Sequence, residues 1–385
     1  MRAIEFFAGV GLVHLTLERL GWEVVLANDI DERKAKTYRR NFPDTKLVVG
    51  DVHELDVSNL PKVELATASF PCIDLSQAGG RSGIDGKHSS AVWGFLDRIV
   101  DLHRTGNAPN WLLIENVPGL LWLHGGASID ALLRRLADLD YSFDVVQVDA
   151  KHFLPQSRNR VFVIAVKNGV EPGPTSHDPF GTSIRRYRVR DVTERNPNFP
   201  WHFFDFPRPP VCSVRLEDLL EELPPDDERW WSTERLNYFW RHLEHDHRTR
   251  MQVLVEAGAT SSLTAVRRGR RRRLREQIFN IRWEGIASCI RTPKGGSSTQ
   301  FVVRIVNGDV RVRRLLGLEA ARLQGVGLLG EREYALPETD TAALMAFGDA
   351  VCVPALRWVV THSIQRAVAG PVVVESAEQQ DLALA

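Results

Sequence analysis

Cysteine is scarce in this sequence. Four cysteines occur in 385 residues, at positions 72, 212, 289 and 352, and none forms a Cys-x-x-Cys pair. The spacing argues against a disulfide framework and a structural zinc site, and it favours a reducing compartment. Histidines at 242, 245 and 247 lack cysteine partners and match no standard zinc finger, so we expect a solvated helix face there and no metal.

An excess of charge of either sign is also missing. Lys and Arg together number 49, Asp and Glu together number 49, and the formal net charge is zero. Any affinity for nucleic acid must then come from a local basic face, because the whole molecule has no field that attracts a polyanion. The segment 267–275 is one candidate, since seven of its nine residues are arginine. Such a run is otherwise a solvated face or a loop.

Leader-like segments and long apolar runs are not apparent. The first residues, 1–7, read directly as a strand, which leaves no room for a signal peptide. No apolar run approaches the ~20 residues of a membrane span, and no Gly-Lys-Ser/Thr motif is present, which excludes a P-loop. With 43% hydrophobic and 25% charged residues, the composition is that of a soluble globular protein of one large or two ordinary domains, and with the scarce cysteines we expect it in the cytoplasm.

The first 31 residues predict a strand–turn–helix–strand unit. A strand over 3–7 is followed by the glycine-containing turn 8–11, a helix over 12–20 and a second strand over 24–27. Glycines at this place let a helix N-terminus approach a ligand closely. The same glycines also allow tight strand–helix packing without any ligand, so the turn alone decides little.

Carboxylates at two strand ends favour the ligand-binding alternative. Asp29 follows the second strand, 18 residues after Gly11, near the ~20-residue offset at which a carboxylate meets ribose hydroxyls. A third strand, over 46–49, ends at Gly50-Asp51. This arrangement suits a cofactor that contains a nucleoside.

A lone cysteine follows the next predicted strand. Apolar and β-branched residues over 63–70 predict this strand, and Pro71 separates it from Cys72. Function on an α/β scaffold commonly lies where a strand gives way to a loop. A free cysteine is, however, more often inert core packing than a nucleophile.

Further charged residues come with later strands. Glu115 follows an apolar strand over 111–114 and either caps the next helix or takes part in chemistry. Arg158 and Arg160 precede the strand 161–166 and share one face of an extended segment. They form either an exposed basic edge or a paired clamp on a polar or anionic ligand.

The composition and periodicity of the sequence change near residue 170. Proline becomes frequent and regular periodicity is poor from there to about 283, apart from an amphipathic helix over 216–223. We predict a catalytic domain formed by 1–171 with 334–385, and a smaller irregular domain over 172–333. Other predicted elements are helices over 91–103, 128–139 and 315–323, a strand over 143–148, and a last helix that opens near Pro354.

Six motifs follow one another along the chain: Phe7-Ala-Gly-Val-Gly11, Phe70-Pro-Cys72, Glu115-Asn-Val117, Gln156-x-Arg-x-Arg160, Arg314–Gly325 and Gly348-x-Ala-Val351. In this order and at these intervals the sequence resembles the DNA (cytosine-5) methyltransferase family, over residues 1–168 and 286–365. The resemblance implies an α/β, Rossmann-like methyltransferase fold: a mixed, mostly parallel sheet with a smaller irregular target-recognition domain. It also implies S-adenosylmethionine as cofactor and double-stranded DNA as substrate.

The resemblance assigns roles position by position. Cys72 would add to carbon-6 of a flipped-out cytosine, because carbon-5 is otherwise too poor a nucleophile to accept a methyl group. Glu115 would hold and protonate the ring, while Arg158 and Arg160 would contact the base and the thiolate. The expected cofactor residues are Phe7, Ala8, Gly9, Gly11, Asp29, Ile30, Asp51, Val52, Pro71, Asp349 and Ala350. The expected DNA contacts are Ser76, Gln77, Gln156, Arg267, Arg268, Arg270, Arg271 and Arg272.

Three positions depart from the family pattern: Leu12 stands for a third glycine, Ile73 for glutamine and Asp349 for asparagine. Because the cysteine, the glutamate and both arginines are present, we expect an active, monomeric enzyme, alone or with restriction or phage-defence proteins. One alternative is a tRNA cytosine-5 methyltransferase on the same scaffold, although Cys212-Ser-Val lacks the Cys-Phe-Thr of that branch. Another is a catalytically silent DNA-binding protein.

Overall fold

The chain forms two compact units, seen in a computed structural model that describes residues 1–71, 91–269, 277–293, 299–328 and 333–369. The large unit contains Met1–Asp149, Asn159–Pro209 and the chain from Val351 onward. The small unit contains Ala150–Arg158 and Pro210–Ala350. The backbone therefore passes between the units four times.

A seven-stranded sheet forms the centre of the large unit. Its strands are β1 (Arg2–Phe6), β2 (Glu23–Asp29), β3 (Lys46–Val49), β4 (Leu65–Ala68), β5 (Trp111–Asn116), β6 (Tyr141–Asp149) and β7 (Asn159–Lys167). Their order across the sheet is β3-β2-β1-β4-β5-β7-β6. The pairs from β3 to β5 are parallel, whereas β7 is antiparallel to both of its neighbours. The predicted mixed, mostly parallel sheet is confirmed.

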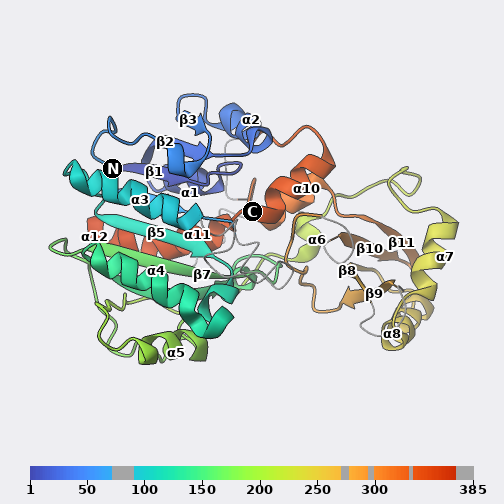
Figure 1. The fold of residues 1–385 in the computed structure, drawn as a ribbon. Coiled ribbons are helices and arrows are strands. Elements are labelled where there is room, and N and C mark those ends of the chain that lie inside the picture. The colour runs from blue at the N-terminus through green and yellow to red at the C-terminus, as the bar shows by residue number, and fades with distance from the viewer. Residues whose placement is uncertain (72–90, 270–276, 294–298, 329–332, 370–385) are drawn as a thin grey trace. The chain divides into compact units, whose positions relative to one another are not determined.

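The central strands are buried on both faces, as parallel strands covered by helices usually are. All four residues of β4 and all six of β5 are buried. The helices of this unit are α1 (Leu12–Arg19), α2 (Glu32–Asn41), α3 (Ala91–Arg104), α4 (Ala127–Asp138), α5 (Tyr187–Arg195), α11 (Val353–Val360) and α12 (Arg366–Ala369). Figure 1 shows α3 and α4 on one face of the sheet and α11 on the other, where α11 contacts α1.

The small unit has its own sheet and core. The antiparallel strands are β8 (Ser261–Gly269), β9 (Gln277–Arg282), β10 (Gln300–Val306) and β11 (Asp309–Arg314), in the order β11-β10-β8-β9. The helices are α6 (Leu216–Leu219), α7 (Thr233–Arg241), α8 (His245–Glu256), α9 (Gly317–Leu323) and α10 (Asp340–Asp349). Aromatic side chains, among them Phe239, Phe279 and Phe301, form the core between this sheet and α7. The region predicted as irregular thus contains a regular four-stranded sheet.

The compact units differ from the predicted domain boundaries in three segments. Residues 172–209 pack in the large unit, 150–158 belong to the small unit, and 334–350 stay with the small unit because α10 packs on α9. The proline-rich segment joins the large unit through main-chain hydrogen bonds between Phe143 of β6 and residues 200 and 202. It thereby covers an edge strand of the sheet. The division into catalytic and recognition functions stays a prediction.

A buried ion pair fixes the same segment. The side chains of Arg185 and Asp144 have no exposed surface, and Nε of Arg185 donates to Oδ1 of Asp144 at 3.0 Å. Arg185 also donates to the Phe204 carbonyl at 2.6 Å, and the Phe204 amide donates to Asp144 at 3.0 Å. Each charge is therefore compensated, as burial of an ion requires.

One apolar run was missed by the sequence analysis. Within Asp340–Val368, an 18-residue window has a mean hydropathy of 1.5, which by length and composition alone would suit a membrane span. The run consists of α10, α11 and α12 with a π-helical turn at Thr361–Gln365, and 67% of the window is buried in the structure. Such burial is usual for helices that pack in a protein core, so the run is weak evidence for a membrane.

Replacing Asp144 by alanine is expected to lower the free energy of unfolding by about 3–5 kcal/mol, because Arg185 would remain buried without its counter-charge. Urea denaturation followed by circular dichroism measures the change. The control is Asp191→Ala, which removes an exposed pair with Arg188 at 3.9 Å and should cost less than about 1 kcal/mol. Equal losses in the two variants would contradict the assigned importance of the buried pair.

Candidate active site and cofactor site

Part of the predicted site lies outside the described residues. These positions are Cys72, Ser76, Gln77, Arg270, Arg271 and Arg272. The side chain of Arg268 is likewise not described. The other predicted site residues lie within the described ranges.

The glycine turn follows β1 and adopts left-handed backbone conformations. Phe7, Gly9 and Gly11 have φ angles of 59°, 58° and 86°. A Cβ atom at Gly11 would lie 2.4 Å from the ring of Phe42 in α2's C-cap position, so only glycine fits here. The amide of Ala8 donates to the Asn28 carbonyl at 2.9 Å, which ties the turn to the end of β2.

Asp29 completes the turn. Its carboxylate accepts hydrogen bonds from the Gly9 amide at 2.7 Å and from the Asp31 amide at 2.8 Å. The residue is 8% exposed. Since each carboxylate oxygen has two acceptor sites, Asp29 can also accept from a hydroxyl of a ligand. The carboxylate at this strand end is predictable from the sequence, whereas its bond to the turn is not.

The neighbouring strand ends present the other predicted cofactor residues of the large unit. Ile30 is 70% exposed, which is unusual for a large apolar side chain beside a strand end. Asp51 is exposed and accepts from the His53 amide at 2.9 Å, whereas Val52 is buried. Pro71 is exposed at the end of the described segment. A glycine turn, two carboxylates and an exposed apolar side chain fit a nucleoside, which needs hydroxyl acceptors and an apolar surface for its base.

A buried polar network beneath the turn was missed by the sequence analysis. Glu5 of β1 has no exposed surface, and the Tyr38 hydroxyl donates to its Oε2 at 3.2 Å. The same hydroxyl lies 2.6 Å from Nδ1 of His14, whose ring stacks on Phe42 with centroids 3.8 Å apart. Burial raises the pKa of Glu5 to about 8, against the lowering effect of hydrogen bonds from Tyr38 and from the His14 backbone. A glutamate between Ile4 and Phe6 in a buried strand was the available signal.

Glu115 and Arg160 form an ion pair between the end of β5 and the beginning of β7. Glu115 is the fifth residue of β5 and Arg160 the second residue of β7. Nε of Arg160 lies 2.9 Å from Oε1 of Glu115, and the two side chains are 14% and 11% exposed. A carboxylate and a guanidinium that share one partly exposed edge can bind a flat polar ring by charge-assisted hydrogen bonds. Taken alone, the pair is also a plausible structural link between two strands.

The next residue of β5 holds the segment that leads to Cys72. Nδ2 of Asn116 donates to the carbonyl of Phe70 at 3.0 Å, and its Oδ1 accepts from the Val117 amide at 2.8 Å. Asn116 is 2% exposed, so this link is shielded from water. Phe70, which stands two residues before Cys72, is thus fixed to Asn116, the residue after Glu115.

Gln156 and Arg158 are buried in the small unit. Gln156 has no exposed surface, donates to the Leu323 carbonyl at 2.5 Å and accepts from the Ile290 amide at 3.1 Å. Arg158 is 1% exposed and donates to the Ile290 carbonyl at 2.8 Å. Most described contacts of the two residues are to backbone groups, and Nη1 of Arg158 also contacts Sγ of Cys289 at 3.4 Å. Arg158 is thus not grouped with Glu115 by any described contact, unlike Arg160.

Asp349 and Ala350, the predicted cofactor residues near the C-terminus, also belong to the small unit. The Thr292 hydroxyl donates to Oδ1 of Asp349. The Ala350 carbonyl accepts from Arg158 and, at 3.4 Å, from Gln324. Their described contacts are therefore within the small unit.

Histidine clusters do not supply a metal site in the described ranges. There, no group of three or more His, Cys, Asp or Glu side chains is placed to hold an ion. His242 stacks on Tyr238, and His247 accepts from the indole of Trp283 at 2.7 Å. These rings serve packing.

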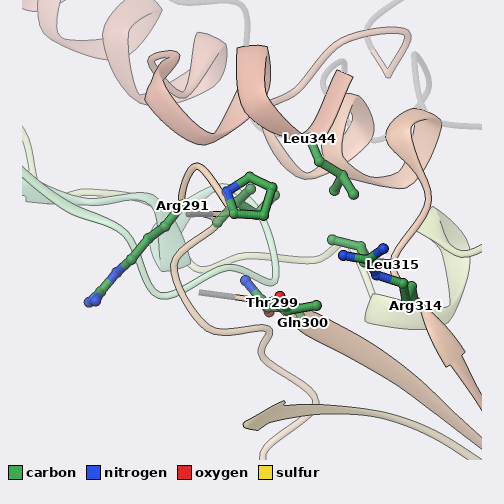
Figure 2. A pocket seen from close by; sticks show the side chains of 8 residues that line it. Arg291, Thr299, Gln300, Arg314, Leu315 and Leu344 are labelled. Atoms are coloured by element: carbon green, nitrogen blue, oxygen red, sulfur yellow. The ribbon is translucent and has the colours of Figure 1, made fainter. Parts of the chain in front are cut away.

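A pocket lies beside the start of β10. It is lined by Ile290, Arg291, Pro293, Thr299, Gln300, Arg314, Leu315 and Leu344. Figure 2 shows Leu344 directed from α10 toward the β10 side of the pocket and Arg291 extending away from it. Nε2 of Gln300 donates to the Ser288 carbonyl at 2.8 Å, while its buried Oε1 has no partner among the residues that the structure describes. Arg267, the described start of the arginine run, is half-buried in β8.

Comparison with known proteins shows to which family the chain belongs. Residues 1–365 match the sequence model of the family described as C-5 cytosine-specific DNA methylase. The chain belongs to this family. The C-5 cytosine methyltransferases that resemble it include bacterial type II enzymes. M.DsaV of Dactylococcopsis salina is 27% identical over 358 residues, which cover 93% of the chain and 84% of that protein.

Other relatives match with different coverage. M2.BsuMI of Bacillus subtilis is 37% identical over 166 residues, which span only 43% of the chain and 42% of that protein. Among solved structures, the Dnmt2 methyltransferase of S. pombe superposes with a TM-score of 0.60 at 16% identity, covering 96% of this methyltransferase and 100% of that chain. The structural likeness supports the fold, and the predicted family is confirmed.

Substitution of Glu5 by glutamine is expected to flatten the pH dependence of stability. Because the pKa of Glu5 rises from 4.5 to about 8 on folding, the folded state binds the proton more tightly. The wild type then loses stability as the pH rises through this range, by roughly 1 kcal/mol per pH unit.

Urea denaturation at several pH values between 5.5 and 8.5 measures the two slopes. Glu23→Gln, at an exposed position of β2, is the matched control and should retain the wild-type slope. Parallel curves for the wild type and Glu5→Gln would show that Glu5 does not titrate in this window.

Proposed function

We propose that this methyltransferase transfers a methyl group from S-adenosylmethionine to carbon-5 of a flipped-out cytosine in a specific duplex DNA sequence, through a covalent adduct with Cys72. The ion pair between Glu115 and Arg160 carries the proposal. It lies next to Asn116, which holds Phe70. Phe70 stands two residues before Cys72, and two residues of chain reach about 7 Å at most.

The proposed chemistry begins with the thiolate of Cys72, which adds to carbon-6 of the base and makes carbon-5 nucleophilic. Glu115, once it has taken up a proton, donates it to ring nitrogen 3, and Arg160 binds the carbonyl oxygen of the ring as negative charge develops there. After carbon-5 has been methylated, loss of its proton and β-elimination restore the double bond and release Cys72. A base in this position must leave the duplex stack.

The cofactor, when bound, supplies a methyl group on a sulfonium, which is a good leaving group. Phe7, Gly9 and Gly11 would surround its amino-acid part and Asp29 its ribose hydroxyls. Asp51 would contact the adenine amino group, with Ile30 against the ring. Support comes from the acceptor at Asp29 and the exposed side chain of Ile30.

Residues 1–171 with 334–385 would bind the cofactor and carry out catalysis. Residues 172–333 would recognise the target sequence. Arg267, Arg268, Arg270, Arg271 and Arg272 would contact DNA phosphates or guanine. We further propose a monomer in the bacterial cytoplasm, acting alone or with restriction or phage-defence proteins. The bacterial type II relatives support this setting.

Cys72→Ala is expected to abolish methyl transfer from labelled S-adenosylmethionine to duplex DNA, because no other group then activates carbon-5. Glu115→Gln should slow transfer about 100-fold or more, as loss of a general acid does. Incorporation of label into DNA, with total tRNA assayed in parallel, measures both effects. Cys212→Ala, the same substitution at a half-buried cysteine of the small unit, is the matched control and should stay active.

The covalent step has its own test. Bisulfite sequencing of DNA from cells that express the protein first maps the methylated site. A duplex with 5-fluorocytosine at this site should then form a denaturation-resistant complex with the wild type in the presence of cofactor, and none with Cys72→Ala. Methyl transfer by Cys72→Ala, or preferential labelling of tRNA, would refute the proposed function.

A further inference from the structure

Three polar side chains are buried in the small unit. Long polar side chains are mostly exposed in proteins, and charged ones are rarely fully buried unless they have partners. Gln156, Arg158 and Gln324 are 0%, 1% and 0% exposed. Gln156 and Arg158 belong to the segment between β6 and β7, and Gln324 follows α9. All three donate to backbone carbonyls, so they bind main chain from distant parts of the sequence.

Arg158 joins two of these parts. Nη1 donates to the carbonyl of Ile290 at 2.8 Å, and Nη2 donates to the carbonyls of Gly348, at 3.3 Å, and Ala350. Hydrogen bonds from a charged donor are stronger than neutral ones. The guanidinium can serve several carbonyls because its donors are spread in a planar fork.

The two glutamines extend the same arrangement. Gln156 connects the Leu323 carbonyl with the Ile290 amide, as described above. Nε2 of Gln324 donates to the Phe347 carbonyl at 2.6 Å. The segment at Ile290, the end of α9 and the end of α10 are thus fixed to one another by side chains.

Packing shows how close these segments lie. A Cβ atom on Gly348 would lie 2.3 Å from the backbone nitrogen of Thr292 and 2.5 Å from the carbonyl carbon of Arg291. The Thr292 hydroxyl also donates to Asp349. Ile290 and Arg291 line the pocket beside β10 (Figure 2). A shift of the α10 end would therefore shift these residues.

We propose that Arg158 is a positioning residue for target recognition, and that it holds the segment 290–292 in place with Gln156 and Gln324 instead of contacting the cytosine or the thiolate. This inference rests on the proposed function, because it assigns residues 172–333, and with them the segment 290–292, to target recognition. Arg160 then remains the arginine that contacts the base.

Arg158→Lys tests the proposal, since one ammonium group cannot satisfy three separated carbonyls. The Michaelis constant for a duplex with the mapped site should rise about tenfold, as expected for loss of a hydrogen bond from a charged group. The preference for the mapped site over a duplex with one flanking base pair changed should fall by about the same factor. The single-turnover rate at saturating DNA should stay within about threefold of the wild type.

Gln324→Leu is the second variant and carries the test if Arg158→Lys folds poorly. It leaves the Phe347 carbonyl without its donor and should also weaken site preference. Because both residues act on one arrangement, the double variant should lose less than the product of the single losses. Matched controls are Gln252→Leu at an exposed position of α8 and Arg188→Lys on α5, where the side chain is 41% exposed.

The outcomes separate this inference from the proposed function. A wild-type protein that methylates no duplex would refute the function. If the wild type is active, two results would overturn the inference alone. One is an Arg158→Lys enzyme with unchanged Michaelis constant and site preference but a single-turnover rate about 100-fold lower, which would indicate direct contact with the base or thiolate. The other is an unchanged site preference in Gln324→Leu.

Discussion

The arrangement of the proposed catalytic edge depends on β5 being paired on both sides. On one side β5 runs parallel to β4, with Ala68 opposite Ile114, and on the other it runs antiparallel to β7, with Glu115 opposite Phe162. The parallel neighbour brings the end of β4 to the end of β5, where Asn116 holds Phe70. The antiparallel neighbour brings the beginning of β7, and therefore Arg160, to the same end. If β7 ran the other way, its first residues would lie at the opposite end of β5.

Local sequence signals predicted the elements that carry the expected cofactor residues. The strand over 46–49 matches β3, and the helix over 12–20 differs from α1 by one residue at its end. Apolar periodicity and glycine placement act within a few residues, so they can be read from the chain directly. The ends of the predicted helices and strands were less accurate than their positions. Glu115 was expected after its strand and lies within β5, and the helix expected over 216–223 ends at Leu219.

Interactions between distant residues could not be predicted in this way. Arg158 looked like one of two equivalent arginines, because Arg158 and Arg160 share a face of an extended segment. Their partners, Ile290 and Glu115, lie 132 and 45 residues away. The pairing of Asp144 with Arg185 and the burial of Glu5 under Tyr38 are likewise properties of the folded chain. The small sheet was missed because β8 continues into the arginine run, which lacks the alternation typical of a half-buried strand.

The segment 150–158 limits how this enzyme can be divided into fragments and recombined in chimaeras. Although it lies between two strands of the large unit, it supplies Gln156 and Arg158 to the small unit. A fragment limited to 210–350 would leave the carbonyls of Leu323, Ile290 and Gly348 without these donors. Chimaeras that exchange the small unit between relatives would therefore need to transplant two stretches of chain at once, 150–158 and 210–350. The same dependence restricts which pairs of small and large units could have been combined during evolution.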